Sequence, residues 1–185
     1  MSIAACFAAD KHSTFEAPAA SSLAHKQTAG RVTVAVDAYV EGDKVKTAFG
    51  KLVPNNYGVL PVLVVIQNDS DQPLRLDKMR AEYVSPNGDR VPATPASDVK
   101  FLRGPRKPSM VGGPAGKVLN GKKNPLEAWE IEGRAFAAQM VPSGNTASGF
   151  LYFQTGLQHG ATLYLSGMVE AQTGKELLYF EIPIE

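Results

Sequence analysis

The chain has 185 residues, of which 44% are hydrophobic and 20% charged, and its formal net charge is +1. This length and composition suit one globular domain with a real core. A charge so close to zero argues against a nucleic-acid partner and against general attraction to an anionic membrane. The single cysteine excludes an intramolecular disulfide, and no apolar run reaches the roughly 18–20 residues of a bilayer-spanning helix.

The first ten residues contain a short pattern that bears on localisation. Residues 3–6 read Ile-Ala-Ala-Cys, which matches the cleavage box of a bacterial lipoprotein signal at every position. In such a signal, small side chains admit the peptidase and the cysteine, here Cys6, takes the lipid. A complete signal also has a basic segment and an apolar segment of about 7–15 residues before the box. Only Met1 and Ser2 precede it here. Either the start is truncated and Cys6 anchors an exported envelope protein, or the match is chance and the protein is cytoplasmic.

The next residues predict a tether. Residues 7–30 are rich in Ala and Ser and show no sustained hydrophobic period. Such a composition is typical of a flexible linker. We therefore expect a tether over residues 1–30 and a folded domain over residues 31–185.

The first half of the domain predicts strands and turns. Residues 31–39 alternate Val with polar residues, which is typical of a half-buried strand. Residues 40–50 predict a turn and a short polar strand. The continuous apolar run at 59–67 predicts a central strand, with residues 74–84 returning as its antiparallel partner. The Asn-Gly pair at 87–88 predicts a hairpin.

The second half predicts one helix and three strands. Asn124 is suited to cap a helix over residues 124–140, with apolar residues at three-to-four spacing. Strands are expected over residues 146–156, 161–171 and 175–185, with Gly174 in the last hairpin loop. About seven strands, one inserted helix and no βαβ alternation predict an all-β fold, an immunoglobulin-like antiparallel β-sandwich.

Two motifs carry a resemblance to a known group of proteins. Residues 68–76 fit N-x-S-x-x-P-L-x-L, and residues 142–153 fit P-x-G-x-x-x-S-G-F-L-Y-F. In both motifs the chain resembles bacterial envelope lipoproteins with an immunoglobulin-like domain and no assigned activity. The resemblance covers most of residues 31–185. It implies the sandwich fold and an envelope location, and it implies no chemistry.

The most unusual stretch is basic and rich in Pro and Gly, which predicts a long loop over residues 103–123. It contains no acidic residue and six basic ones: Arg103, Arg106, Lys107, Lys117, Lys122 and Lys123. Long loops in compact domains are often functional. These residues form the candidate binding site, for an envelope protein or an anionic polymer. The alternative is a solvated insertion whose charge maintains solubility.

No residues form a recognisable catalytic or metal site. The three histidines, His12, His25 and His159, lack metal-ligand spacing, and no serine motif accompanies them. Asp69 and Asp71 are two residues apart, but the later oxygen ligands of a calcium loop do not follow. We expect no enzyme activity, no cofactor and no metal.

Aromatic residues gather in the last three predicted strands: Phe150, Tyr152, Phe153, Tyr164, Tyr179 and Phe180. An outward-facing aromatic surface could stack on sugars, whereas the alternative is core packing and cross-strand pairing. The sequence therefore predicts a non-enzymatic, lipid-anchored envelope module with a binding or assembly role. Its membrane contact would be the lipid anchor alone. The alternatives are a structural subunit that forms homo-oligomers and a carbohydrate-binding module.

Overall fold

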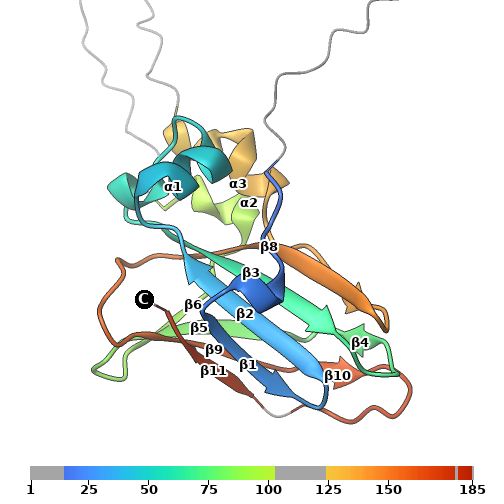
Figure 1. The fold of residues 1–185 in the computed structure, drawn as a ribbon. Coiled ribbons are helices and arrows are strands. Elements are labelled where there is room, and N and C mark those ends of the chain that lie inside the picture. Colours follow the sequence, from blue (N-terminus) through green and yellow to red (C-terminus); the bar gives the residue numbers. More distant parts are fainter. Residues whose placement is uncertain (1–14, 103–123, 178, 185) are drawn as a thin grey trace, which may run out of the picture.

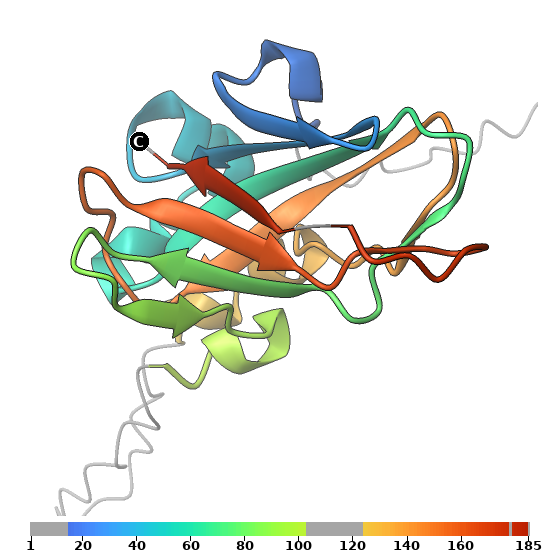
Figure 2. The same ribbon diagram turned by 90° about the horizontal axis from the view of Figure 1, so that it is seen from below.

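The computed structural model describes residues 15–102, 124–177 and 179–184, and these form a β-sandwich (Figures 1 and 2). The first sheet has the order β1 (His25–Ala29), β2 (Val32–Ala38), β3 (Leu60–Asn68), β8 (Asn145–Phe153). The second has the order β11 (Phe180–Pro183), β9 (Thr162–Ser166), β5 (Arg80–Val84), β6 (Arg90–Pro92). A third, small sheet has the order β10 (Val169–Glu170), β4 (Leu74–Arg75), β7 (Met140–Val141). All pairs are antiparallel, which confirms the predicted fold class.

Short helices interrupt the strands. The α-helices are α1 (Gly42–Phe49), α2 (Ala96–Val99) and α3 (Trp129–Gly133). The 3-10 turns are η1 (Ala20–Ser22), η2 (Pro54–Tyr57) and η3 (Pro125–Glu127). We call α1, α2 and α3 the helical cap, because they lie together at one end of the sandwich (Figure 1). No helix in the described ranges is long and apolar enough to cross a membrane.

Strand β3 is the centre of the fold, as its apolar run predicts. It lies between β2 and β8, and both of its faces are buried. One face contributes Val62, Val64 and Ile66 to the core between the two main sheets. The other contributes Leu63 and Val65 to a second core beneath the helical cap. A strand covered on both faces needs apolar residues at successive positions, which explains the unbroken run.

The two main sheets also meet at their edges. On one side, Thr94 N donates to Tyr152 O at 2.7 Å, which links the end of β6 to β8. On the other side, Glu181 N donates to the Gln27 side chain at 2.8 Å, which links β11 to β1. Both contacts cover strand edges that would otherwise offer unpaired backbone groups to another chain.

The prediction of a turn and polar strand at residues 40–50 is wrong, because residues 42–49 form helix α1. Val45, Ala48 and Phe49 are buried at helical spacing beneath its exposed side. Gly50 ends the helix with φ of +61°. One apolar stripe over eight residues is sufficient when a sheet face lies beneath it.

Residues 74–84 do not pair with β3, so that predicted pairing is wrong. The segment divides into β4, which pairs with β7 and β10, and β5, which pairs with β6 and β9. The neighbours of β3 are β2 and β8 instead. The predicted hairpin at 87–88 is confirmed, because it joins β5 to β6 and Gly88 has φ of +88°.

The helix predicted over residues 124–140 is confirmed only in its first half. Asn124 Oδ1 accepts from Leu126 N at 3.1 Å and so caps η3, and α3 then ends at Gly133. Beyond it the chain runs along β8, where Phe150 N donates to Arg134 O at 2.8 Å. This pairing satisfies backbone groups on a strand edge that would otherwise be open.

Regular structure starts before Arg31, the boundary that the sequence predicts. Strand β1 lies within residues 15–30 and pairs with β2 over its whole length. At the other terminus, Phe180, Ile182 and Ile184 are buried at alternate positions. Leu178 lies outside the described residues.

The described residues contain eleven strands, more than the seven or so expected, because several are only two to five residues long.

Candidate functional site

Arg134 holds the helical cap together. Its guanidinium donates to Thr47 O at 2.9 Å and also to Ala48 O, two carbonyls in the last turn of α1. A cation at a helix C-terminus satisfies carbonyls that lack helical partners and interacts favourably with the helix dipole. Burial lowers the pKa of Arg134 from its ordinary value. Arg134 thus joins α1 to the chain that follows α3.

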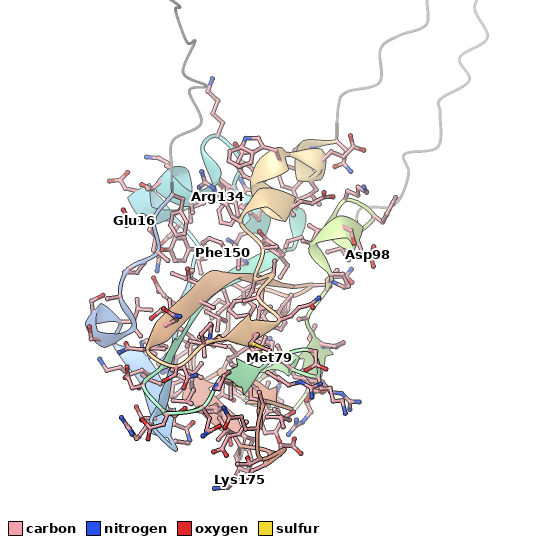
Figure 3. The ribbon with its side chains drawn as sticks, turned by 90° about the vertical axis from the view of Figure 1, so that its right-hand side faces the viewer. Glu16, Met79, Asp98, Arg134, Phe150 and Lys175 are labelled. Atoms are coloured by element: carbon pink, nitrogen blue, oxygen red, sulfur yellow. The ribbon has the colours of Figure 1, made fainter. Side chains whose placement is uncertain are left out.

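The same guanidinium contacts two aromatic rings. Its central carbon lies 5.3 Å from the ring centroid of Phe15 and 5.3 Å from that of Trp129. Trp129 begins α3, and its indole lies so close to Gly133 that a Cβ there would come within 2.7 Å of it. Figure 3 shows Glu16, Arg134 and Asp98 at one end of the molecule and Lys175 at the other. The N-terminal segment therefore meets the sandwich at the helical cap.

Phe15 is the first described residue, and it is packed against the domain. Its ring lies 5.3 Å from that of Phe150 and 6.1 Å from that of Tyr39, the latter edge-on. Farther along the same segment, Ala20 is fully buried against the outer face of the first sheet. We call residues 15–24 the N-terminal strap, because they pack along the domain before β1 begins.

The aromatic cluster beneath the strap is tightly ordered. Phe49 and Tyr39 each contact Phe150, with ring centroids 4.8 and 4.9 Å apart. Tyr152 donates its hydroxyl to Ile131 O at 2.7 Å, and burial raises its pKa above the ordinary value. Burial, aided by the neighbouring carboxylate of Asp37, raises the pKa of Tyr39 to about 12. These hydroxyls are therefore neutral at physiological pH.

The two ends of the predicted basic loop also lie at the helical cap. Asn124 Nδ2 donates to Lys100 O at 2.7 Å, which fixes the residue after the loop to α2. Lys100 Nζ lies 3.7 Å from Glu132 Oε1, which connects α2 to α3. Residues 103–123, with all six predicted binding residues, lie outside the described residues, and so does Cys6.

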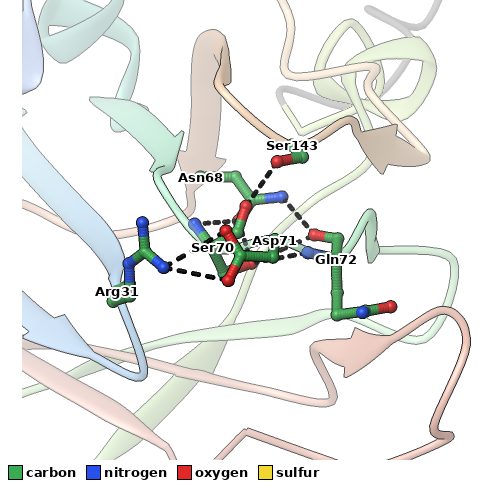
Figure 4. Close-up of polar contacts among 6 residues, drawn as sticks. All are labelled: Arg31, Asn68, Ser70, Asp71, Gln72 and Ser143. Carbon is green, nitrogen blue, oxygen red and sulfur yellow. Dashed lines mark hydrogen bonds and ion pairs between the residues drawn. The ribbon is translucent and has the colours of Figure 1, made fainter.

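The motif at residues 68–76 is a turn organised by one buried amide (Figure 4). Asn68 Nδ2 donates to Gln72 O at 2.8 Å and to Val141 O at 2.9 Å. Asn68 Oδ1 accepts from Ser70 Oγ at 2.6 Å. Ser143 Oγ donates to Ser70 O at 2.5 Å, so the turn is tied to the start of the second motif. Asn68 therefore has a structural role in both motifs.

The two carboxylates of this turn already have partners. Gln67 donates to both oxygens of Asp69, at 3.0 and 2.9 Å. Arg31 donates to both oxygens of Asp71, at 3.2 and 3.1 Å. Elsewhere, His25 lies in β1 and His159 before β9, while His12 lies outside the described residues. Within the described ranges no three His, Cys, Asp or Glu residues converge on a position that could hold a metal.

The aromatic residues of the last strands divide between core and surface. Phe150, Tyr152, Phe153 and Phe180 are buried. Tyr164 and Tyr179 face outward from the second sheet and stack, with centroids 5.3 Å apart. Arg90 lies over Tyr164 at 4.8 Å and donates to Glu82 at 2.6 Å. Arg90 and Tyr179 therefore both contact the ring of Tyr164. Tyr179, 52% exposed, offers the accessible ring of this surface.

A small cavity of about 170 Å³ opens beside the edge of β8 that does not face β3. It lies between two segments that pair with that edge, one at Thr94 and the other at Phe136. Its lining is mostly apolar, with Ala96, Leu151 and Phe136 among the contacts. None of the lining residues suggests a catalytic role.

The sequence did not single out Phe15 or Arg134. The sequence did contain a signal for Phe15 as a packing residue, since it is one of the few large apolar residues in a long stretch of Ala and Ser. Arg134 had none, because its partners are backbone carbonyls of α1 and rings that are distant in sequence.

No protein-family model matches this chain, and no curated protein matches it. Among solved structures, it is similar to the X-ray structure of the Northeast Structural Genomics Consortium target SoR45. That similarity has 12% sequence identity and a TM-score of 0.36, over 83% of each chain. At this TM-score the similarity carries no argument about fold or function.

Proposed function

We propose that this chain is a non-enzymatic binding or assembly module of a bacterial envelope, anchored by a lipid at Cys6. Its contact surface would be the six basic residues of segment 103–123, and its partner an envelope protein or an anionic polymer. The observation that supports this is convergence at one end of the sandwich. The N-terminal strap and both ends of the basic segment meet at the helical cap, although they are far apart in sequence.

Chain length limits how far the cap could lie from such an anchor. From Cys6 to Phe15 there are nine residues, which at about 3.3–3.6 Å each span at most about 32 Å. Phe15 is held by Phe150 and Arg134, so this reach is measured from a defined point of the domain. A lipid on Cys6 would keep the cap near the membrane, and the basic segment would extend from that side.

The binding proposal is tested by a charge-removal variant. Arg103, Arg106, Lys107, Lys117, Lys122 and Lys123 are changed to Ser together, and binding to a purified envelope fraction is measured across salt concentrations. We expect loss of a salt-sensitive interaction, since contacts between solvent-exposed charges are screened by salt. The matched control changes six exposed basic residues elsewhere to Ser: Lys46, Lys51, Arg75, Lys78, Arg80 and Lys175. Equal binding by both variants would refute the assignment.

A deletion provides a second test. Replacing residues 103–123 by a short Gly-Ser linker should leave the fold intact, because Asn124 and Lys100 are joined directly at the base. The thermal midpoint should change little, while binding is lost. Light scattering of the same variant would show whether the segment instead mediates self-assembly.

The anchor is tested separately. The gene is expressed with its upstream region in its own host, and the mass of the mature N-terminus is determined. A chain that starts at a diacylglyceryl-modified Cys6 would support the anchor. A chain that starts at Met1 or Ser2 with a free thiol would rule it out.

Carbohydrate binding is the second candidate, and Tyr179 favours it. This ring is exposed and held in place by Tyr164, which suits stacking on a sugar. A glycan array compares the chain with a Tyr179→Ser variant. Binding that this substitution removes would support the candidate, and an array without hits would reject it.

A further inference from the structure

We propose that the outer surface of the helical cap, through Trp129 and Phe101, rests on the surface of a zwitterionic lipid bilayer. This rests on the proposed lipid anchor and extends it, because the domain itself would then contact the membrane. The reasons are where the chain leaves the domain, which side chains are exposed there, and how charge is distributed around them.

The strap sets the position of the cap relative to an anchor. Phe15 contacts Arg134, and Arg134 contacts Trp129, so the first described residue after Cys6 lies near the exposed indole. A tether of at most about 32 Å, attached there, brings the cap to the bilayer before any other part of the sandwich.

Two exposed aromatic side chains occupy this end. Among the described residues, the large hydrophobic side chains that remain exposed are Phe101 at 63%, Tyr179 at 52%, Met140 at 51% and Trp129 at 44%. Phe101 directly follows α2, and its amide donates to Asp98 O at 2.9 Å. Trp129 begins α3, and α2 and α3 are joined by the ion pair between Lys100 and Glu132. Trp and other amphipathic aromatic residues concentrate at the membrane–water interface, where an apolar ring meets polar headgroups.

Among the described residues of the cap, charges of both signs surround these rings. Lys100 Nζ lies 5.4 Å from the ring of Phe101, so an ammonium group accompanies the more exposed ring. Acidic side chains are close as well: Asp98, Glu127, Glu130 and Glu132. A surface of mixed sign gains little from an anionic membrane but suits headgroups that carry both charges. We therefore expect contact that depends weakly on salt, unlike the interaction proposed for the basic segment.

The sequence makes a direct experiment possible, since the chain has one tryptophan and one cysteine. The Cys6 thiol of the full chain is coupled to a maleimide-headgroup lipid in vesicles of phosphatidylethanolamine and phosphatidylcholine. Emission of Trp129 is then compared between tethered and free protein, with acrylamide as the aqueous quencher and brominated lipid as the membrane quencher. We expect a blue shift, protection from acrylamide and quenching by brominated lipid on tethering.

Matched variants identify the contact surface. Phe101→Ser should reduce quenching by brominated lipid at least about twofold, because it removes apolar area from the interface. Tyr179→Ser and Met140→Ser remove side chains of similar exposure elsewhere and should change nothing. The variant with six Ser replacements in segment 103–123 should also keep the quenching.

Each other outcome overturns the proposal. An indole that stays open to acrylamide and is not quenched by brominated lipid would show that the cap does not touch the bilayer. Equal losses from Phe101→Ser and Tyr179→Ser would remove the assignment to the cap. Loss of quenching in the six-Ser variant would assign the contact to the basic segment. Because the tether is chemical, none of these results depends on whether the cell lipidates Cys6.

Discussion

Gly149 is a position at which one added methyl group should have a large effect. A Cβ on this residue would lie 2.5 Å from Phe136 Cα and 2.6 Å from Phe136 N. Both are backbone atoms, so no side-chain rotation can relieve the clash. Gly149→Ala should therefore push the segment that carries Arg134 away from β8.

The magnitude follows from what that movement breaks. Phe136 N donates to Phe150 O at 2.9 Å, and Phe150 N donates to Arg134 O at 2.8 Å. Two such bonds are worth about 1 kcal/mol each. Overpacking of a filled site adds about 1–3 kcal/mol. We expect a loss of about 3–5 kcal/mol in the free energy of unfolding, a large part of the 5–15 kcal/mol typical of a domain.

Urea unfolding, followed by Trp129 fluorescence, measures this loss. The matched control is Gly156→Ala, because a Cβ at Gly156 meets no atom within 4 Å and its φ is not positive. The control should stay within about 0.5 kcal/mol of the parent chain. If Gly149→Ala also stays within that range with an unchanged denaturant slope, the close approach of the two backbones is not what holds this segment.

Three further predictions concern the strap, the turn and the aromatic cluster. Phe15→Ala should cost about 1–2 kcal/mol and speed proteolysis within residues 15–24, since it removes ring contacts at a half-buried position. Asn68→Ala should lower stability by about 2–4 kcal/mol in thermal unfolding, because two carbonyls lose a buried donor and Ser70 loses an acceptor. The pKa of Tyr39 is raised to about 12 in the folded state, against about 10 unfolded. The folded state therefore keeps a proton that the unfolded state loses, so stability should fall between pH 10 and 12. Tyr39→Phe should reduce this fall by about 1–2 kcal/mol in urea titrations at each pH, whereas an unchanged fall would contradict it.

Local periodicity was sufficient to predict the two central strands, β2 and β3. The alternation at 31–39 reflects one buried and one partly exposed face of β2. The unbroken apolar run of β3 reflects burial on both faces. These patterns depend only on which side of a strand is covered, so a single sequence carries them.

Strand partners could not be predicted in the same way. Residues 74–84 follow β3 in the chain, yet β3 pairs with β8, which begins at Asn145. The choice depends on how the two sheets close around one core, which is a property of the whole chain. Helix α1 was missed for a related reason, because its single apolar stripe is explained only by the sheet surface beneath it.

For the candidate site, the sequence predicted only the composition of the segment and not its contacts. Basic character and Pro/Gly content marked segment 103–123 as an insertion, and Asn124 was correctly predicted as a helix cap at its end. The aromatic surface was left open between two interpretations, and the structure divides it, with four rings buried and two outward. The contacts of Arg134 with Thr47 and Phe15 bring together residues that no short-range pattern connects.

The second motif now has a physical meaning that bears on where function can lie. Gly149 admits the backbone of Phe136, Phe150 supports Phe15 of the strap, and Tyr152 bonds to the cap through Ile131 O. Each of these residues attaches the helical cap or the strap to β8. The motif therefore specifies how the cap and the strap are attached to the sandwich. Because Phe150, Leu151 and Tyr152 also line the cavity beside β8, the residues that fix the cap shape this cavity as well.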